Sequence, residues 1–251
     1  MKTKICTIIL AAGLGTRMKS DKAKVLHAIL GRPMISYVVE TAVNISGENV
    51  VLVVGHQADT VRRVVSKQAT VRYALQEKQL GTGHAVMCAL PYVPDTADNV
   101  MLLSGDVPNL SAETARRLLN EHLAADRDLS ILAIDIDRPK GYGRIIVDSA
   151  GRVARIVEEV DASVAQKQIK TINTGIYCAK KNFLFDALKK VKADNAQGEY
   201  YLTDIIEIGC TAGRCVGVMV GRDPDEVLWV NSVQDLMAAE NIMRLRRGKI
   251  A

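Results

Sequence analysis

The sequence lacks the features of membrane proteins and of disulfide-stabilised secreted proteins. No apolar run reaches the roughly 18 residues of a membrane-spanning helix, and the start shows no signal-peptide cleavage pattern. The five cysteines are odd in number and scattered, with no C-x-x-C pair, which favours reduced and mostly buried thiols. These absences predict a cytoplasmic protein that does not act on a membrane.

A strong charge of one sign is also absent from most of the chain. The 251 residues carry a formal net charge of +5, which by itself would suggest a nucleic-acid partner. However, four of the 33 basic residues and none of the 28 acidic residues lie in the last eight positions, so residues 1–243 carry only +1. These four are Arg244, Arg246, Arg247 and Lys249. We therefore expect small-molecule partners, no nucleic acid, and a basic tail.

Short apolar runs alternate with helical patterns in the first half of the chain. The patterns predict strands at 5–11, 50–54, 70–75 and 99–104, and helices at 34–45, 58–67, 83–90 and 111–124, the last capped by Ser111. Such alternation with nearly all-apolar strands predicts a parallel sheet with helices on both faces. Ligands of these sheets bind beyond the carboxyl ends of the strands, so the segments after residues 10, 75 and 104 are the candidates.

The second half of the chain has a different pattern. It predicts strands at 129–135, 143–148, 152–159, 172–179 and 215–220, and helices at 182–192, 201–212 and 232–246. We expect antiparallel strands here to complete one mixed, mostly parallel, Rossmann-like α/β sheet and to form the far wall of a cleft. Residues 1–231 would form one domain, followed by a closing helix and basic tail at 232–251; a separate linker-joined domain is the alternative. The sequence does not predict an oligomeric state.

A glycine-containing loop at residues 10–18 follows the first predicted strand. Gly13 and Gly15 have no Cβ, so the backbone amides there can approach an anion, and Arg17 adds charged donors. The alternative is a tight structural turn. A dinucleotide-binding fingerprint is disfavoured because Met18 stands where its third glycine would be, and because the second strand ends without an acidic residue.

Two further segments place charged groups beside this loop. Lys24 is either solvated or, together with Arg17, neutralises a triphosphate. Asp106 follows an apolar strand and Gly105, so its carboxylate lies at the carboxyl edge of the sheet. It is either a ligand for a divalent ion bound to phosphates or the start of the turn before Pro108.

A third segment combines a strand end with a glycine-flanked helix start. Gln76 ends a predicted strand and has both a donor and an acceptor with which to read a nucleobase. Gly81 and Gly83 flank Thr82, which suggests close approach of the backbone to a ligand. His84 is interpreted as a packed or capping histidine rather than a catalytic one.

Together these segments resemble the sugar-phosphate nucleotidyltransferase family, and within it the uridylyltransferases that make UDP-N-acetylglucosamine. The resemblance extends over nearly the whole chain and is carried by residues 10–18, 24–27, 79–85, 105–108, 141–145, 156–158, 172–175 and 195–204. It implies a nucleotide-diphospho-sugar transferase fold. It also implies formation of UDP-N-acetylglucosamine, a cell-wall precursor, and pyrophosphate from UTP and N-acetylglucosamine 1-phosphate, with Mg²⁺ as cofactor.

The resemblance also assigns roles to individual residues. Arg17 and Lys24 would be catalytic and would face the triphosphate and the departing pyrophosphate. Asp106 and Asn231 would hold Mg²⁺, and Asn231 would also line the substrate site. The uridine and its phosphates would contact Leu10, Ala11, Ala12 and Gly13, and the uracil would contact Gln76, Gly81 and Thr82. The amino sugar would contact Gly143, Glu158 and Asn173, with Gly105 in the same wall.

The chain departs from the family pattern at several positions. The departures are Ala23 for a proline, Ser104 for an aromatic residue, Glu159-Val160 for a basic pair, Trp229 for a glycine and Val233 for an arginine. Trp229 either narrows the sugar-phosphate site or packs as a hydrophobic cap. The sequence leaves open another sugar 1-phosphate or nucleotide, and a nucleotide-sugar sensor without turnover. The hexapeptide repeats of the family's bifunctional members are absent from these 251 residues, so we expect no acetyltransferase activity.

Overall fold

The structure is a computed structural model in which residues 4–248 are described. Their central sheet follows the strand order β11–β7–β10–β6–β1–β4–β5. The strands of this path are β1 (Ile5–Ala11), β4 (Val50–Val54), β5 (Arg72–Leu75), β6 (Asn99–Ser104), β7 (Leu129–Asp135), β10 (Thr171–Lys180) and β11 (Val216–Val220). Only β10 runs against its neighbours among these seven strands, so the predicted mixed, mostly parallel sheet is confirmed.

Helices cover both faces of this sheet because the side chains of each buried strand alternate between two cores. Ile5 and Ile9 of β1 pack on one side with α1 (Met34–Ser46), α2 (Ala58–Val65) and α4 (Ala112–Ala124). Cys6 and Ile8 pack on the other side with α3 (Thr82–Ala89), α5 (Lys181–Leu188) and α6 (Asp204–Thr211). The predicted two-sided coverage, typical of nearly all-apolar parallel strands, is therefore confirmed.

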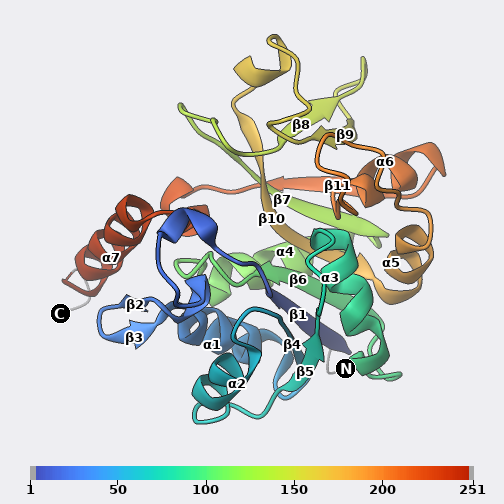
Figure 1. The fold of residues 1–251 in the computed structure, drawn as a ribbon. Helices are drawn as coiled ribbons and strands as arrows, with labels where there is room; N and C mark the ends of the chain where they lie inside the picture. The colour runs from blue at the N-terminus through green and yellow to red at the C-terminus, as the bar shows by residue number, and fades with distance from the viewer. Residues whose placement is uncertain (1–3, 249–251) are drawn as a thin grey trace.

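An antiparallel extension rises from one end of the sheet. It consists of β8 (Arg144–Val147) and β9 (Val153–Val157), and β8 pairs with β10 through Ile172 and Arg144. Figure 1 shows this pair beyond the main sheet, away from α1 and α2. It matches the expected antiparallel addition.

The structure corrects the bounds of some predicted elements. The helix predicted at 201–212 begins only at Asp204, because the preceding backbone bonds across the chain instead of along a helix. Tyr200 N donates to Leu80 O at 2.8 Å, and Gly83 N donates to Tyr200 O at 2.7 Å. The strand predicted at 152–159 ends at Val157, and the strand predicted at 70–75 begins at Arg72.

Sequence analysis missed a short hairpin, β2 (Ala28–Ile29) and β3 (Arg32–Pro33). Its turn places Leu30 at φ 47° and Gly31 at φ 77°, and leucine gives no turn signal. The closing helix α7 (Val233–Gly248) lies beside this hairpin in Figure 1, on the opposite side of the molecule from α5 and α6.

The apolar stripe of α7 packs on its own domain. Leu236, Ala239 and Met243 join a small cluster with the hairpin and the start of α1. The basic tail is partly paired, because Arg246 contacts Asp223 at 2.7 Å. The predicted tail residue Lys249 lies outside the described residues. Within the described part of the chain, no helix combines the length and apolarity that crossing a membrane requires.

Candidate nucleotide and sugar-phosphate site

A cavity of about 520 Å³ lies where the glycine loop after β1 meets the carboxyl ends of β5 and β6. All of the predicted site residues except Gly105 and Gly143 line it. The lining residues from that prediction are Leu10, Ala11, Ala12, Gly13, Arg17, Lys24, Gln76, Gly81, Thr82, Asp106, Glu158, Asn173 and Asn231. The fold thus collects residues that lie more than two hundred positions apart, such as Leu10 and Asn231, into one cavity.

Gly105 and Gly143 lie directly behind lining residues. Gly105 N donates to Leu10 O at 2.8 Å, and a Cβ on Gly105 would lie 2.9 Å from the same oxygen. Gly143 O accepts a hydrogen bond from Asn173 N at 2.9 Å. Gly105 therefore lets the backbone of β1 approach, and a Cβ on Gly143 would instead lie 2.9 Å from the Ile156 side chain.

The glycine loop leaves open space on its cavity side and packs tightly on its other side. A Cβ on Gly13 would meet no atom within 4 Å, whereas one on Gly15 would lie 2.6 Å from Lys24 Cβ. Gly15 also has a φ of +65°, in the region that favours glycine. Arg17 is exposed at the mouth, and its guanidinium makes no hydrogen bond within residues 4–248.

Three side chains converge beside this loop. Lys24 Nζ lies 2.5 Å from Asp106 Oδ2 and donates to Asn231 Oδ1 at 2.8 Å. All three are partly buried, with exposed side-chain fractions of 14% for Lys24 and 18% for Asp106. The sequence placed Lys24 against a triphosphate, whereas the structure places its ammonium between the two predicted metal ligands.

Asn231 is held at this point from two sides. Val230 N donates to Asp106 O at 2.9 Å, which joins the segment before α7 to the end of β6. Asn231 N donates to Asp235 Oδ2 at 3.0 Å. Asp235 also accepts from Ser232 N, and Ser232 Oγ accepts from Asp235 N, so a capping box fixes the helix start next to Asn231.

The donor set of this group fits a hard divalent cation. Among residues 4–248 no three His, Cys, Asp or Glu side chains cluster as a closed metal site. Mg²⁺, however, is usually held by one or two protein oxygen ligands together with substrate phosphates and water. Asp106 and Asn231 supply two such oxygens, and both already point at one positive charge, the Lys24 ammonium.

Gln76 and Gly81 form another part of the cavity wall. Gln76 is only 3% exposed, and its Nε2 donates to Gly81 O at 3.0 Å. Glycine is required at position 81, because φ is +105° and a Cβ would lie 2.6 Å from Tyr200 O. Thr82 lines the cavity, but its Oγ1 accepts from Leu202 N at 3.1 Å, which ties α3 to the segment before α6.

Glu158 and Asn173 line a further part of the wall. Burial raises the pKa of Glu158, and the hydrogen bond from Thr203 Oγ1, 3.2 Å away, partly opposes this shift. Asn173 Oδ1 accepts from Tyr177 Oη at 2.9 Å and from Gly175 N at 3.1 Å, so its Nδ2 is the donor left for a ligand. Sequence reasoning missed Tyr177 and Thr203, although Thr203 lies in the 195–204 segment that carries the family resemblance.

Trp229 packs as a cap and also lines the cavity. Its Nε1 donates to Thr174 O at 2.9 Å, and its ring lies 4.7 Å from that of Tyr142 at an angle of 41°. The accepting carbonyl belongs to the irregularity of β10 between Asn173 and Tyr177. The indole therefore links β10, which carries Asn173, to the segment that carries Asn231.

Two other departures have structural partners. Ala23 N donates to Gln57 Oε1 at 3.0 Å, a bond that proline could not make, so the Lys24 loop is held rather than loosened. Glu159 pairs with the buried guanidinium of Arg144 at 2.8 Å. It is thus an internal ion-pair partner instead of a phosphate contact.

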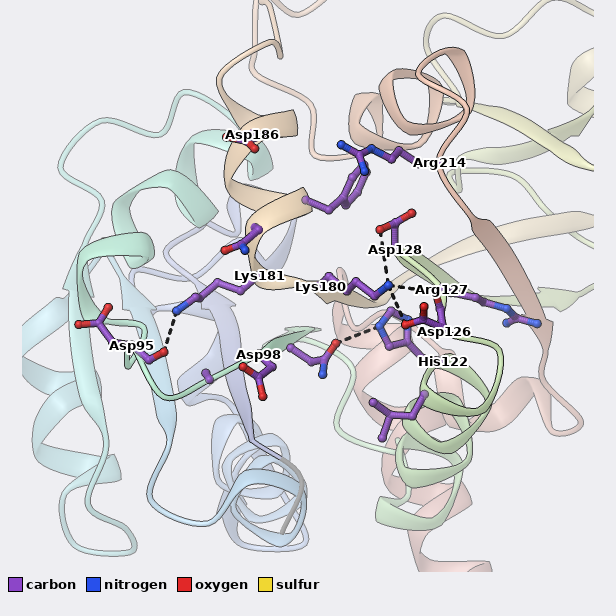
Figure 2. A pocket seen from close by; sticks show the side chains of 15 residues that line it. Asp95, Asp98, His122, Asp126, Arg127, Asp128, Lys180, Lys181, Asp186 and Arg214 are labelled. Atoms are coloured by element: carbon purple, nitrogen blue, oxygen red, sulfur yellow. Dashed lines mark hydrogen bonds and ion pairs between the residues drawn. The ribbon is translucent and has the colours of Figure 1, made fainter. Parts of the chain in front are cut away.

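A second cavity, of about 580 Å³, lies at the other end of the strands, beside the amino ends of β6 and β7 and the carboxyl end of β10 (Figure 2). In it Lys180 Nζ lies 2.8 Å from Asp126 Oδ1, and Lys181 Nζ donates to the backbone oxygen of Asp95 at 3.0 Å. Burial lowers the pKa of His122 to about 4, so this side chain is neutral at pH 7. None of the predicted site residues lines this cavity, and we do not take it as the candidate site.

Comparisons with known proteins show the family of this chain. A family model described as nucleotidyl transferase matches residues 6–232. The protein called bifunctional protein GlmU from Brevibacillus brevis is 47% identical over 244 residues, which are 97% of this chain and 52% of that protein. The same-named protein from Geotalea uraniireducens is 44% identical over 245 residues, 98% of this chain and 54% of the relative. The chain thus spans about half the length of these two relatives.

A solved structure supports the fold. It is a Bacillus anthracis protein described as a glucose-1-phosphate thymidylyltransferase, crystallised with sucrose. It superposes with a TM-score of 0.76 and 20% sequence identity, covering 96% of this chain and 95% of the other. At this identity the likeness establishes the architecture alone.

Proposed function

The chain belongs to the nucleotidyl transferase family, and we propose that it transfers a uridylyl group from UTP to N-acetylglucosamine 1-phosphate. The products would be UDP-N-acetylglucosamine and pyrophosphate. Members of the family act on small-molecule substrates. The relatives called bifunctional protein GlmU, similar over nearly the whole of this chain, support this choice of substrates.

One observation supports the proposal: a single cavity combines a buried amide suited to a nucleobase, an oxygen pair suited to a cation and a polar wall suited to a sugar. Gln76 supplies a buried amide, Lys24 and Asp106 supply the charges, and Asn173 supplies a donor next to Glu158. The glycine loop lies between these groups with its backbone open to the cavity at Gly13. This combination suits a nucleoside triphosphate together with a sugar phosphate.

The chemistry requires positioning and charge neutralisation more than proton transfer. The attacking group is a phosphate oxygen of the sugar phosphate, which is already ionised at pH 7 because its second pKa is about 6. It forms a bond to the α-phosphorus of UTP while the bond to the pyrophosphate oxygen breaks. No general base is required, and Arg17 and Lys24 would stabilise the charge on the leaving pyrophosphate.

Family members generally use a divalent metal ion, and we propose Mg²⁺ between Asp106 and Asn231. When bound, it would neutralise phosphate charge as a Lewis acid. The carboxylate of Asp106 and the amide oxygen of Asn231 would hold it, and Lys24 would then turn to the phosphates. The Asp106 carboxylate would then have a cation beside it both with and without the metal, Lys24 in the first state and Mg²⁺ in the second.

A substrate panel tests the proposal. Pyrophosphate release is measured for UTP, CTP, ATP and dTTP, each combined with N-acetylglucosamine 1-phosphate, glucose 1-phosphate and galactose 1-phosphate in the presence of Mg²⁺. We expect the highest kcat/KM for UTP with N-acetylglucosamine 1-phosphate. A higher value for another pair overturns the substrate assignment, and binding without pyrophosphate release supports a sensor instead.

A matched pair of variants tests the site itself. Asp106→Ala is expected to lower Mg²⁺-dependent turnover by at least about 100-fold, since it removes the charged ligand, while the melting temperature and circular dichroism show an intact fold. Asp95→Ala removes an exposed carboxylate at the other end of the strands and is expected to leave turnover unchanged. Near-normal turnover of Asp106→Ala contradicts the assignment.

A further inference from the structure

The side-chain amide of Gln76 has only one orientation compatible with its surroundings. One side of the amide lies 3.0 Å from Gly81 O. A carbonyl oxygen can only accept, so the Gln76 nitrogen must face it. Gly81 O is held in place because it also accepts a hydrogen bond from Ala85 N in the first turn of α3, at 3.1 Å.

The second hydrogen of the same nitrogen is also used inside the protein. Gln76 Nε2 lies 3.1 Å from His84 Nδ1 in α3. Since this nitrogen of Gln76 is a donor, His84 Nδ1 must be an acceptor, and the ring proton of a neutral His84 then lies on Nε2. His84 Nε2 faces Cys88 Sγ, 3.8 Å away and one helical turn later.

Both amide hydrogens of Gln76 are thus occupied, and its Oε1 is the polar atom left over. This oxygen accepts no hydrogen bond from any group within residues 4–248. It is also not one of the fully buried side-chain atoms that lack a partner, so part of its surface remains accessible. Gln76 lines the cavity while His84 does not. The cavity wall therefore presents an acceptor at this position, and His84 acts from behind it.

We propose that His84 is a positioning residue that locks the amide of Gln76 so that the site selects uracil over cytosine. The inference rests on the proposed function and names the origin of its base preference. Uracil has a donor, N3–H, which an acceptor on the wall can bind. Cytosine has an acceptor at N3, which would meet Oε1 with repulsion unless the amide turned over. Two contacts, with Gly81 O and with His84 Nδ1, oppose this rotation of the amide, and without His84 Nδ1 only the contact with Gly81 O remains.

The test compares His84→Leu with His84→Asn. Leucine removes the acceptor, whereas the Oδ1 of asparagine takes the place of Nδ1. We expect the UTP/CTP ratio of kcat/KM to fall by about tenfold in His84→Leu, the effect of one lost buried hydrogen bond, and to be largely retained in His84→Asn. Because thymine carries the same N3–H as uracil, the UTP/dTTP ratio should stay the same in both variants.

A control on the same helix separates positioning from packing. Cys88→Ala removes the weak partner of His84 but leaves Nδ1 in place, so the UTP/CTP ratio should stay close to that of the unaltered protein. An unchanged UTP/CTP ratio in His84→Leu, or an equal loss in His84→Asn, overturns the inference. An equal fall in the UTP/dTTP ratio also overturns it, because the effect would then not depend on N3.

Direct binding distinguishes this inference from the proposed function. Calorimetry gives Kd values for UTP and CTP without any sugar phosphate. A UTP preference that falls in His84→Leu supports the inference even if pyrophosphate is never released, in which case the proposed function alone fails. An unaltered protein that binds neither nucleotide, or binds both equally, overturns the inference.

Discussion

Replacing Lys24 by methionine should strengthen divalent-metal binding while it weakens turnover. In the absence of substrate, the ammonium of Lys24 occupies the position between Asp106 Oδ2 and Asn231 Oδ1, at 2.5 and 2.8 Å. A metal ion that uses the same two oxygens must first displace it. Methionine keeps most of the length of the side chain but has no charge, so the carboxylate becomes free for the metal.

The size of the effect follows from these contacts. A hydrogen bond to a charged group contributes about 1.5–3 kcal/mol, and both partners here are less than one fifth exposed, so solvent screening removes only part of this. Removing the competitor should therefore tighten metal binding by roughly 10- to 100-fold, at about 1.4 kcal/mol per factor of ten. Turnover should fall by about 100- to 1,000-fold, because a donor to the phosphates is lost.

The assay is Mn²⁺ binding without nucleotide, followed by the electron paramagnetic resonance signal of the free ion. Lys22→Met is the matched control, because Lys22 has the same charge, lies two residues away and is exposed. It should bind Mn²⁺ as the unaltered protein does. Unchanged or weaker Mn²⁺ binding by Lys24→Met would refute the idea that lysine and metal compete for one position.

Two further variants test other parts of the cavity wall. Trp229 is partly buried and lines the cavity, so Trp229→Gly should cost less than the roughly 3–5 kcal/mol of a fully buried aromatic residue. Because the indole bonds to β10, which carries Asn173, the change should raise KM for the sugar phosphate more than KM for UTP; equal changes in both would contradict this role. Burial raises the pKa of Glu158 from its ordinary value of 4.5. Above the raised pKa the buried side chain is ionised, which lowers the free energy of unfolding. Below pH 4.5 it is protonated in both the folded and the unfolded state, so this loss is absent. Glu158→Gln should therefore raise the melting temperature at pH 8, with a gain that disappears near pH 4, and weaken sugar-phosphate binding; an equal gain at both pH values would exclude the burial argument.

The regular part of the fold was predictable because local pattern and tertiary packing agree there. The apolar run Ile5–Ala11 is a strand that is buried at every position except Leu10, and Ser111 caps α4 with its Oγ accepting from Thr114 N at 3.0 Å. The irregular parts depend on distant partners. Residues 201–203 are not helical because the backbone around them bonds to Leu80, Thr82 and Gly83.

The composition of the site was accessible from the sequence, but its internal contacts were not. The family resemblance placed Lys24 and Asp106 in one site without indicating that they touch, since they lie 82 positions apart. The same holds for Gln76 and His84, whose types alone suggested a base reader and a packed histidine. Only the fold shows that His84 lies against the Gln76 amide, where it determines which amide atom faces the cavity.

The departures from the family pattern also change meaning when they are considered in space. From the sequence, Ser104 is a lost aromatic contact and Trp229 a separate gain of bulk. In the structure both side chains lie beside Gly175. A Cβ on Gly175 would lie 2.8 Å from Ser104 Oγ and 3.5 Å from Trp229 Cζ2. An aromatic residue at position 104 and the indole at position 229 would therefore lie against the same part of the wall. In this chain the aromatic surface there comes from Trp229, which belongs to the segment that also carries Asn231.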